Sequence, residues 1–150
     1  MKSFPGMLFV LFFVSSLSAT DLVPDSVFTI QGRVEFSKDI TVTVTCLTQK
    51  EFEDELPAKY FYVRHLDAND LQNGYIDYNI TSIPEGDYII FAFQDKNEND
   101  KLDRILIVPR EYWDIYGLAR PTKGKPDFDK LSLHIDKNIS QLNMTLKNGF

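Results

Sequence analysis

Apolar and polar residues alternate one by one along most of this 150-residue chain. The clearest run is residues 40–47, where threonine occupies every second position between Ile, Val, Val and Cys. Successive side chains of a strand point to opposite faces of a sheet, so this period of two predicts β-strands rather than helices. Seven short strands are expected, at residues 28–36, 40–47, 60–66, 76–80, 88–93, 131–135 and 142–146.

Turn signals separate these runs. They lie at Ser37-Lys38-Asp39, Gln72-Asn73-Gly74 and Ile83-Pro84-Glu85-Gly86-Asp87, where Gly, Pro, Asn and Asp suit tight turns. Only residues 49–56 are expected to form a helical turn. Seven strands with short turns predict an all-β fold, a seven-stranded β-sandwich of immunoglobulin-like or transthyretin-like type, in one domain over residues 20–150.

Several large or branched residues are expected in the core of this sandwich. Residues 88–93 are apolar on both faces and are expected to form a central strand. The residues expected to be mostly buried are Val42, Val44, Ile76, Tyr78, Ile89, Phe91, Leu133 and Met144.

The N-terminus has the composition of an export signal. Lys2 precedes an eight-residue apolar run, MLFVLFFV at 7–14, and small residues follow up to Ala19. Residues 1–19 are therefore predicted to be a signal peptide, cut after Ser18 or Ala19, and the mature protein to be secreted or periplasmic. The run is shorter than the roughly 20 residues of a transmembrane helix, and no later segment is expected to span a bilayer. An uncleaved anchor is the alternative.

The formal net charge of −6 argues against binding to nucleic acid, which requires a basic surface. The single cysteine, Cys46, excludes an intramolecular disulfide. It shares a strand face with Ile40, Val42 and Val44, so we expect it to be a small buried core residue.

An acidic loop follows the expected central strand directly. Its oxygen-bearing side chains alternate as in the first part of an EF-hand loop, which favours Ca²⁺. The predicted ligands are Asp95, Asn97, Asn99, the carbonyl of Lys101, and Asp103. Position six is Asp100 instead of Gly and position twelve is Leu106 instead of Glu, so any site is expected to be weak. The alternative is an acidic turn without a metal ion.

The longest stretch without strand alternation is residues 109–130. It contains four candidate ligand-binding residues, Tyr112, Trp113, Tyr116 and Arg120, whose rings could stack on a sugar or contact a partner protein. The favoured interpretation is that these aromatic residues fold back and cap the end of the sandwich. The alternative is a carbohydrate-binding or protein-binding module.

No catalytic constellation is visible. The two histidines are His65 and His134, and His134 shares its strand face with Ser132 and Asp136, which indicates an exposed position. Neither a Gly-x-Ser-x-Gly elbow nor a His-Glu-x-x-His motif is present. The sequence therefore predicts a protein that is not an enzyme, with an unidentified protein or glycan as partner.

Two stretches of the chain resemble the pattern of a bacterial family. The family pattern GxYA…FxDxNxNGKLD is matched by Gly86-Asp87-Tyr88, by FAFQDKNEN at 91–99 and by Lys101-Leu102-Asp103. The pattern GIPxEGYGFSNNAR…GPPSFxDA is matched by Val108-Pro109-Arg110-Glu111, Tyr116-Gly117, Ala119-Arg120 and Lys125-Pro126-Asp127-Phe128-Asp129.

These motifs resemble domain-of-unknown-function family 2141, a family of exported bacterial proteins, and the resemblance covers roughly residues 28–147. It implies a periplasmic or secreted β-sandwich and no enzyme activity. Two departures stand out: Asp100 replaces the glycine of the pattern, and the FSNN stretch before Ala119-Arg120 is absent.

Overall fold

The computed structural model describes residues 26–37, 40–99, 102, 104–105, 108–109, 111–121 and 124–148. These residues form ten strands and three short helices, so the chain is all-β, as the alternation predicts. The expected signal peptide, residues 1–19, lies outside the described residues. Within the described ranges, no helix combines the length and apolar character needed to cross a bilayer.

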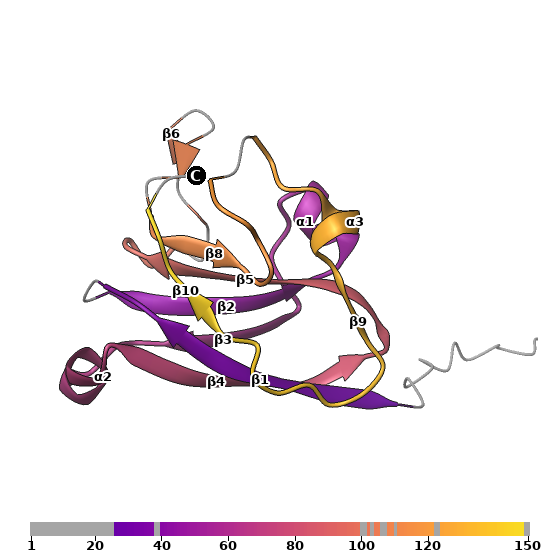
Figure 1. Ribbon diagram of the computed structural model, residues 1–150, viewed down its shortest axis with the longest axis horizontal. Helices are drawn as coiled ribbons and strands as arrows, with labels where there is room; N and C mark the ends of the chain where they lie inside the picture. The colour runs from indigo at the N-terminus through magenta and orange to yellow at the C-terminus, as the bar shows by residue number, and fades with distance from the viewer. Residues whose placement is uncertain are drawn as a thin grey trace, which may run out of the picture.

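One sheet has three strands in the order β10–β1–β4 (Figure 1). These are β1 (Val27–Glu35), β4 (Tyr75–Pro84) and β10 (Met144–Thr145). β1 and β4 are antiparallel and β10 runs parallel to β1, so that Val34 lies opposite Ile76 and beside Met144. All three side chains are buried, which puts them on the inner face of this sheet.

The other sheet has five strands in the order β3–β2–β5–β8, with β9 also paired to β5. Its members are β2 (Thr41–Leu47), β3 (Tyr60–Arg64), β5 (Gly86–Asp95), β8 (Trp113–Ile115) and β9 (Leu133–Ile135). β5 is the hub of this sheet, because β2, β8 and β9 all pair with it. The expected central strand is therefore confirmed.

The main core lies between the two sheets. It takes side chains from β1, β4 and β10 on one side and from β2, β5 and β9 on the other. Its buried members are Ile30, Val34, Val42, Val44, Cys46, Ile76, Tyr78, Ile80, Ile83, Tyr88, Ile90, Ala92, Ile135, Leu142, Met144 and Leu146.

A second apolar cluster covers the outer face of the five-stranded sheet. It contains Ile89 and Phe93 of β5, and the two short helices α1 (Gln49–Glu53) and α3 (Phe128–Leu131) pack near it (Figure 1). The rings of Phe52 and Phe128 meet there with centroids 6.1 Å apart. This cover explains why β5 is apolar on both faces, since each face meets a different layer.

Two predicted core residues, Phe91 and Leu133, are only half-buried, whereas the other six are buried. Phe91 points to the outer face of its sheet. In the row of residues that face each other across the strands, Phe91 lies opposite Thr45 of β2. Thr45 in turn lies opposite Phe61 of β3, which is 58% exposed. The cover formed by the second cluster is therefore incomplete at this end of the row.

Besides differences in strand length, the secondary structure has elements that were not expected. Leu131 belongs to α3 rather than to a strand, and β8 forms within the stretch expected to be irregular. The remaining differences are α2 (Ala68–Asn73) and an antiparallel pair formed by β6 (Arg104–Ile105) and β7 (Val108–Pro109). The helical turn expected at residues 49–56 is confirmed as α1.

Candidate functional site

Two buried carboxylates lie at the base of the acidic loop. Asp95, the last residue of β5, is 1% exposed and Glu111 is 3% exposed. Glu111 Oε1 accepts a hydrogen bond of 2.7 Å from the backbone N–H of Lys96. Asp95 Oδ1 accepts one of 3.2 Å from the backbone N–H of Asn99. Both side chains therefore bind the backbone of the same turn.

Three of the five predicted calcium ligands lie in this turn, namely Asp95, Asn97 and Asn99. The other two, Lys101 and Asp103, lie outside the described residues. In the described part of the chain, no three His, Cys, Asp or Glu side chains converge as metal ligands. Calcium binding stays a prediction, and the contact from Asn99 to Asp95 also fits the alternative of a metal-free acidic turn.

Sequence reasoning missed Glu111. The EF-hand pattern covers only one loop, and Glu111 comes sixteen positions after Asp95, beyond its end. The family pattern has a glutamate at this position, but neither its burial nor its contact with the acidic loop follows from that motif. A buried glutamate needs hydrogen-bond donors, and here the backbone of Lys96 supplies one.

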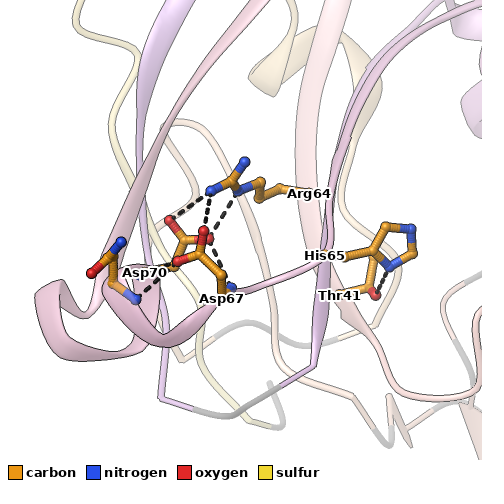
Figure 2. Close-up of polar contacts among 6 residues, drawn as sticks. Thr41, Arg64, His65, Asp67 and Asp70 are labelled. Carbon is orange, nitrogen blue, oxygen red and sulfur yellow. Dashed lines mark hydrogen bonds and ion pairs between the residues drawn. The ribbon is translucent and has the colours of Figure 1, made fainter.

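A hydroxyl, an imidazole and a carboxylate meet beside this turn. Thr41 Oγ1 lies 2.9 Å from His65 Nδ1 and donates a hydrogen bond of 3.1 Å to Glu98 Oε1. The contact between Thr41 and His65 is visible in Figure 2. Glu98 Oε1 also lies 3.2 Å from the same Nδ1.

This trio does not have the geometry of a nucleophilic relay. In such a relay, histidine contacts the hydroxyl with one ring nitrogen and the carboxylate with the other. Here both groups contact Nδ1, and the hydroxyl proton is directed to Glu98. With the hydroxyl proton directed to Glu98, Thr41 Oγ1 is not positioned to give that proton to His65.

Arg64 links β3 to the start of α2 through ion pairs. Its Nε lies 2.8 Å from Asp70 Oδ2, and its Nη2 lies 2.9 Å from Asp67 Oδ2 (Figure 2). Asp67 also caps α2 by accepting hydrogen bonds from the backbone N–H groups of Asn69 and Asp70. The hydrogen bond from Arg64 lowers the pKa of Asp70. These contacts are structural, because every carboxylate oxygen of Asp67 and Asp70 accepts a hydrogen bond from Arg64 or from the backbone at the start of α2.

The four candidate binding residues of the aromatic stretch are placed differently from one another. Trp113 is 3% exposed and belongs to the second cluster, so its faces are used in packing. Tyr112 and Tyr116 are half-buried against the main core. Arg120 lies 4.2 Å above the Trp113 ring and donates to the Trp113 carbonyl at 2.7 Å. This arrangement fits the interpretation of a cap.

Asp114 and Arg120 form a loose pair beneath this cap, with 3.9 Å between Arg120 Nε and Asp114 Oδ1. Burial raises the pKa of Asp114, against the hydrogen bond from the Thr145 N–H. Burial also lowers the pKa of Arg120. Both shifts have burial as their main cause and disfavour the charged forms.

Cys46 is fully buried in the main core, as its strand face predicts. Burial raises the pKa of its thiol to about 12. The thiolate is the reactive form of cysteine, so this side chain is chemically inert in the folded protein.

The comparison with protein families gives one match. The model of the family described as "uncharacterized protein conserved in bacteria (DUF2141)" matches residues 33–143. No curated protein and no solved structure matches the chain. The matched region includes the strands from β2 to β9, the acidic loop and the aromatic stretch. The chain belongs to the DUF2141 family.

Proposed function

We propose that this chain is an exported, non-enzymatic β-sandwich protein whose acidic loop holds a weak structural calcium ion. The sandwich would be one domain over residues 20–150, of immunoglobulin-like or transthyretin-like type. The export signal at residues 1–19 would direct it to the periplasm or the exterior. The observation that carries the calcium proposal is the pair of buried carboxylates, Asp95 and Glu111, on one turn.

The charge of these two groups supports a cation. Each carboxylate is almost fully removed from water, and both bind the backbone between Lys96 and Asn99. Carboxylates that lie on one turn are groups that a hard divalent cation prefers as ligands. Ca²⁺ accepts carboxylate, amide and backbone carbonyl oxygens, which are the groups this loop offers.

Glu111 is relevant to the glutamate ligand that the loop itself lacks. An EF-hand loop ends in a glutamate at position twelve, and this chain has Leu106 there. Glu111 brings a carboxylate to the loop from the segment that follows it. Affinity is expected in the range of about 10⁻⁴–10⁻³ M, which is typical of extracellular calcium modules.

Calcium titration tests this proposal. With a dissociation constant of about 1 mM, roughly 10 mM calcium should stabilise the fold by about 1.4 kcal/mol and raise the melting temperature by a few degrees. Asp95→Ala and Glu111→Gln should abolish the increase, whereas Asp136→Asn, a change to an exposed carboxylate, should keep it. Unchanged melting and no heat in calorimetry would leave only an acidic turn.

The non-enzymatic character is supported by the chemistry of the described residues. The closest approach to a catalytic set, formed by Thr41, His65 and Glu98, has both partners on one histidine nitrogen. The only thiol is buried in the core. A binding role for residues 109–130 is the alternative, and it would rest on Tyr112 and Tyr116, which keep part of their surface exposed.

A further inference from the structure

A polar hollow of about 500 Å³ lies on the outer face of the three-stranded sheet. Its floor is formed by neighbouring positions of β1 and β4, with Gln31 opposite Asn79 and Arg33 opposite Asp77. Its wall is the segment from Ser140 to Asn143, which runs beside β1 just before β10. The hollow is separate from both the acidic loop and the aromatic stretch.

The wall of this hollow is fixed closely against the sheet. Gly32 makes this possible, because a Cβ at this position would collide with the carbonyl oxygen of Leu142. Tyr78 donates its hydroxyl proton to that same carbonyl at 2.8 Å. The backbone N–H of Leu142 binds the Gln31 carbonyl at 3.1 Å, and Asn143 Oδ1 accepts from the Arg33 N–H at 3.0 Å.

The backbone of the wall adopts a left-handed conformation at Gln141, whose φ is +64°. A non-glycine residue adopts this conformation at a cost, and such residues persist where surrounding contacts hold them. The contacts at Leu142 and Asn143 hold this one. The result is a preformed wall, and a preformed site loses less entropy when a ligand binds.

Arg33 is fixed as well. Its Nε and Nη2 lie 2.9 Å and 3.4 Å from the two carboxylate oxygens of Asp77. Its guanidinium lies 3.7 Å from the centre of the Tyr75 ring. The pair presents donors and acceptors in one orientation, and its charges cancel.

The amides around this pair are unused by the protein. Within the described residues, no hydrogen bond engages the side chains of Gln31, Asn79 or Gln141. Each amide offers an acceptor oxygen and a donor NH₂ group. The hollow therefore presents closely spaced, neutral amides on a rigid floor, and each amide can both donate and accept hydrogen bonds.

We infer that this hollow binds a saccharide unit of a neutral glycan through Gln31, Asn79, Gln141 and the fixed pair of Arg33 and Asp77. A saccharide hydroxyl both donates and accepts, which matches an amide and an ion pair with free donor and acceptor capacity. An apolar ligand would leave these amides and the ion pair of Arg33 and Asp77 without hydrogen-bond partners, which disfavours it.

Two other ligand classes fit less well. An extended peptide adds to a sheet through the open edge of a strand. Both edges of β1 are already paired at this place, with β4 on one side and with residues 139–145 on the other. An anionic polymer needs uncompensated cations, and the one cation of the hollow is neutralised by Asp77.

The test is native affinity electrophoresis of the intact chain in gels containing dextran, xylan, laminarin, mannan or, as an acidic counterpart, alginate. Retardation is expected in at least one neutral gel. The double variant Gln31→Ala/Asn79→Ala should weaken the binding about tenfold or more, because two hydrogen bonds are lost. Gln72→Ala removes an exposed amide of α2, outside the hollow, and should have no effect. A thermal melt of each variant confirms that it is folded.

An oligosaccharide of the retarding polymer is then titrated into ¹⁵N-labelled protein. The side-chain NH₂ signals of Gln31, Asn79 and Gln141 should shift, and that of Gln72 should not. No retardation in any neutral gel, or retardation in alginate alone, would overturn the inference. Retardation that survives the double variant but is lost in Tyr116→Ala would also overturn it and place the glycan at the aromatic stretch. None of these outcomes depends on calcium, so this result and that of the calcium titration are independent.

Discussion

His134 lies between two carboxylates where β9 pairs with β5. Its Nδ1 is 2.8 Å from Asp87 Oδ1, and its Nε2 is 3.7 Å from Glu85 Oε1. The hydrogen bond to Asp87 is the main reason why the pKa of His134 is raised, and the charges of Asp87, Asp136 and Glu85 add to it. The strand alternation predicts the exposed position of His134, but the two carboxylates beside it depend on strand pairing.

This contact predicts a pH dependence. Folding raises the pKa of His134, so its contribution to stability is complete below the unfolded value of about 6.5 and is lost as pH rises through the folded value. The melting temperatures of the native protein and Asp87→Asn should therefore differ most at acidic pH and converge at alkaline pH. NMR titration should give His134 a lower pKa in the variant. An equal pKa in both proteins would contradict the contact.

At the same scale, the sequence predicts some residues well and others not at all. Cys46 and the valines of β2 are buried as expected, because a strand face follows from alternation alone. Glu111 is buried although no apolar periodicity marks its position, and only the family pattern contains a glutamate there. Its burial depends on how the chain returns from the acidic loop to β5, and that path is set by contacts between residues distant in sequence.

At the scale of elements, long alternating runs are predicted and short elements are missed. β1, β2, β4 and β5 have between seven and ten residues each and overlap the expected strands, with β4 and β5 longer than the expected 76–80 and 88–93. β8 has three residues, and it forms because Trp113 and Ile115 pair with Phe93 and Phe91 of β5. Three residues are too few to show a period of two, so only the partner strand reveals them.

The helix α2 was missed for a related reason. It has six residues, less than two turns, and no buried face. Its signals are the capping box formed by Asp67 and Asp70 and the left-handed Gly74 at its end. The Gln72-Asn73-Gly74 motif predicts a turn, and Gly74 does reverse the chain there, but as the C-cap of a helix.

The contact between β1 and the segment before β10 gives a prediction at this scale. Gly32→Ala should destabilise the protein by about 1–3 kcal/mol, because the new methyl group would meet the backbone carbonyl of Leu142. Gly74→Asn is the matched control, since the space around Gly74 is open and asparagine tolerates a positive φ. Chemical denaturation measures both. Equal stability of Gly32→Ala and the native protein would mean that the segment does not approach β1 this closely.

At the scale of the whole molecule, the sequence predicts the composition of the layers but not their order. Alternation indicates that each strand has one buried face, and the apolar run of β5 indicates a strand covered on both sides. The pairing order β3–β2–β5–β8 and the return of residues 139–145 alongside β1 are long-range choices. The hollow on the three-stranded sheet arises from that return, so no motif in the sequence marks it.

The expected export signal is also a property of the whole chain, and it gives the last prediction. β1 begins at Val27, well after the predicted cut near Ala19, so removal of residues 1–19 would leave every described strand intact. Protein recovered from the exporting compartment should begin between Ala19 and Asp21 by N-terminal sequencing. Its melting temperature should equal that of a chain produced from Thr20 onward.

Charged substitutions in the apolar run, Leu11→Asp with Phe12→Asp, should keep the unprocessed chain in the cytoplasm, because the run would no longer be apolar enough to direct export. Exported protein that retains Met7 to Val14 would show instead that this segment is an uncleaved anchor.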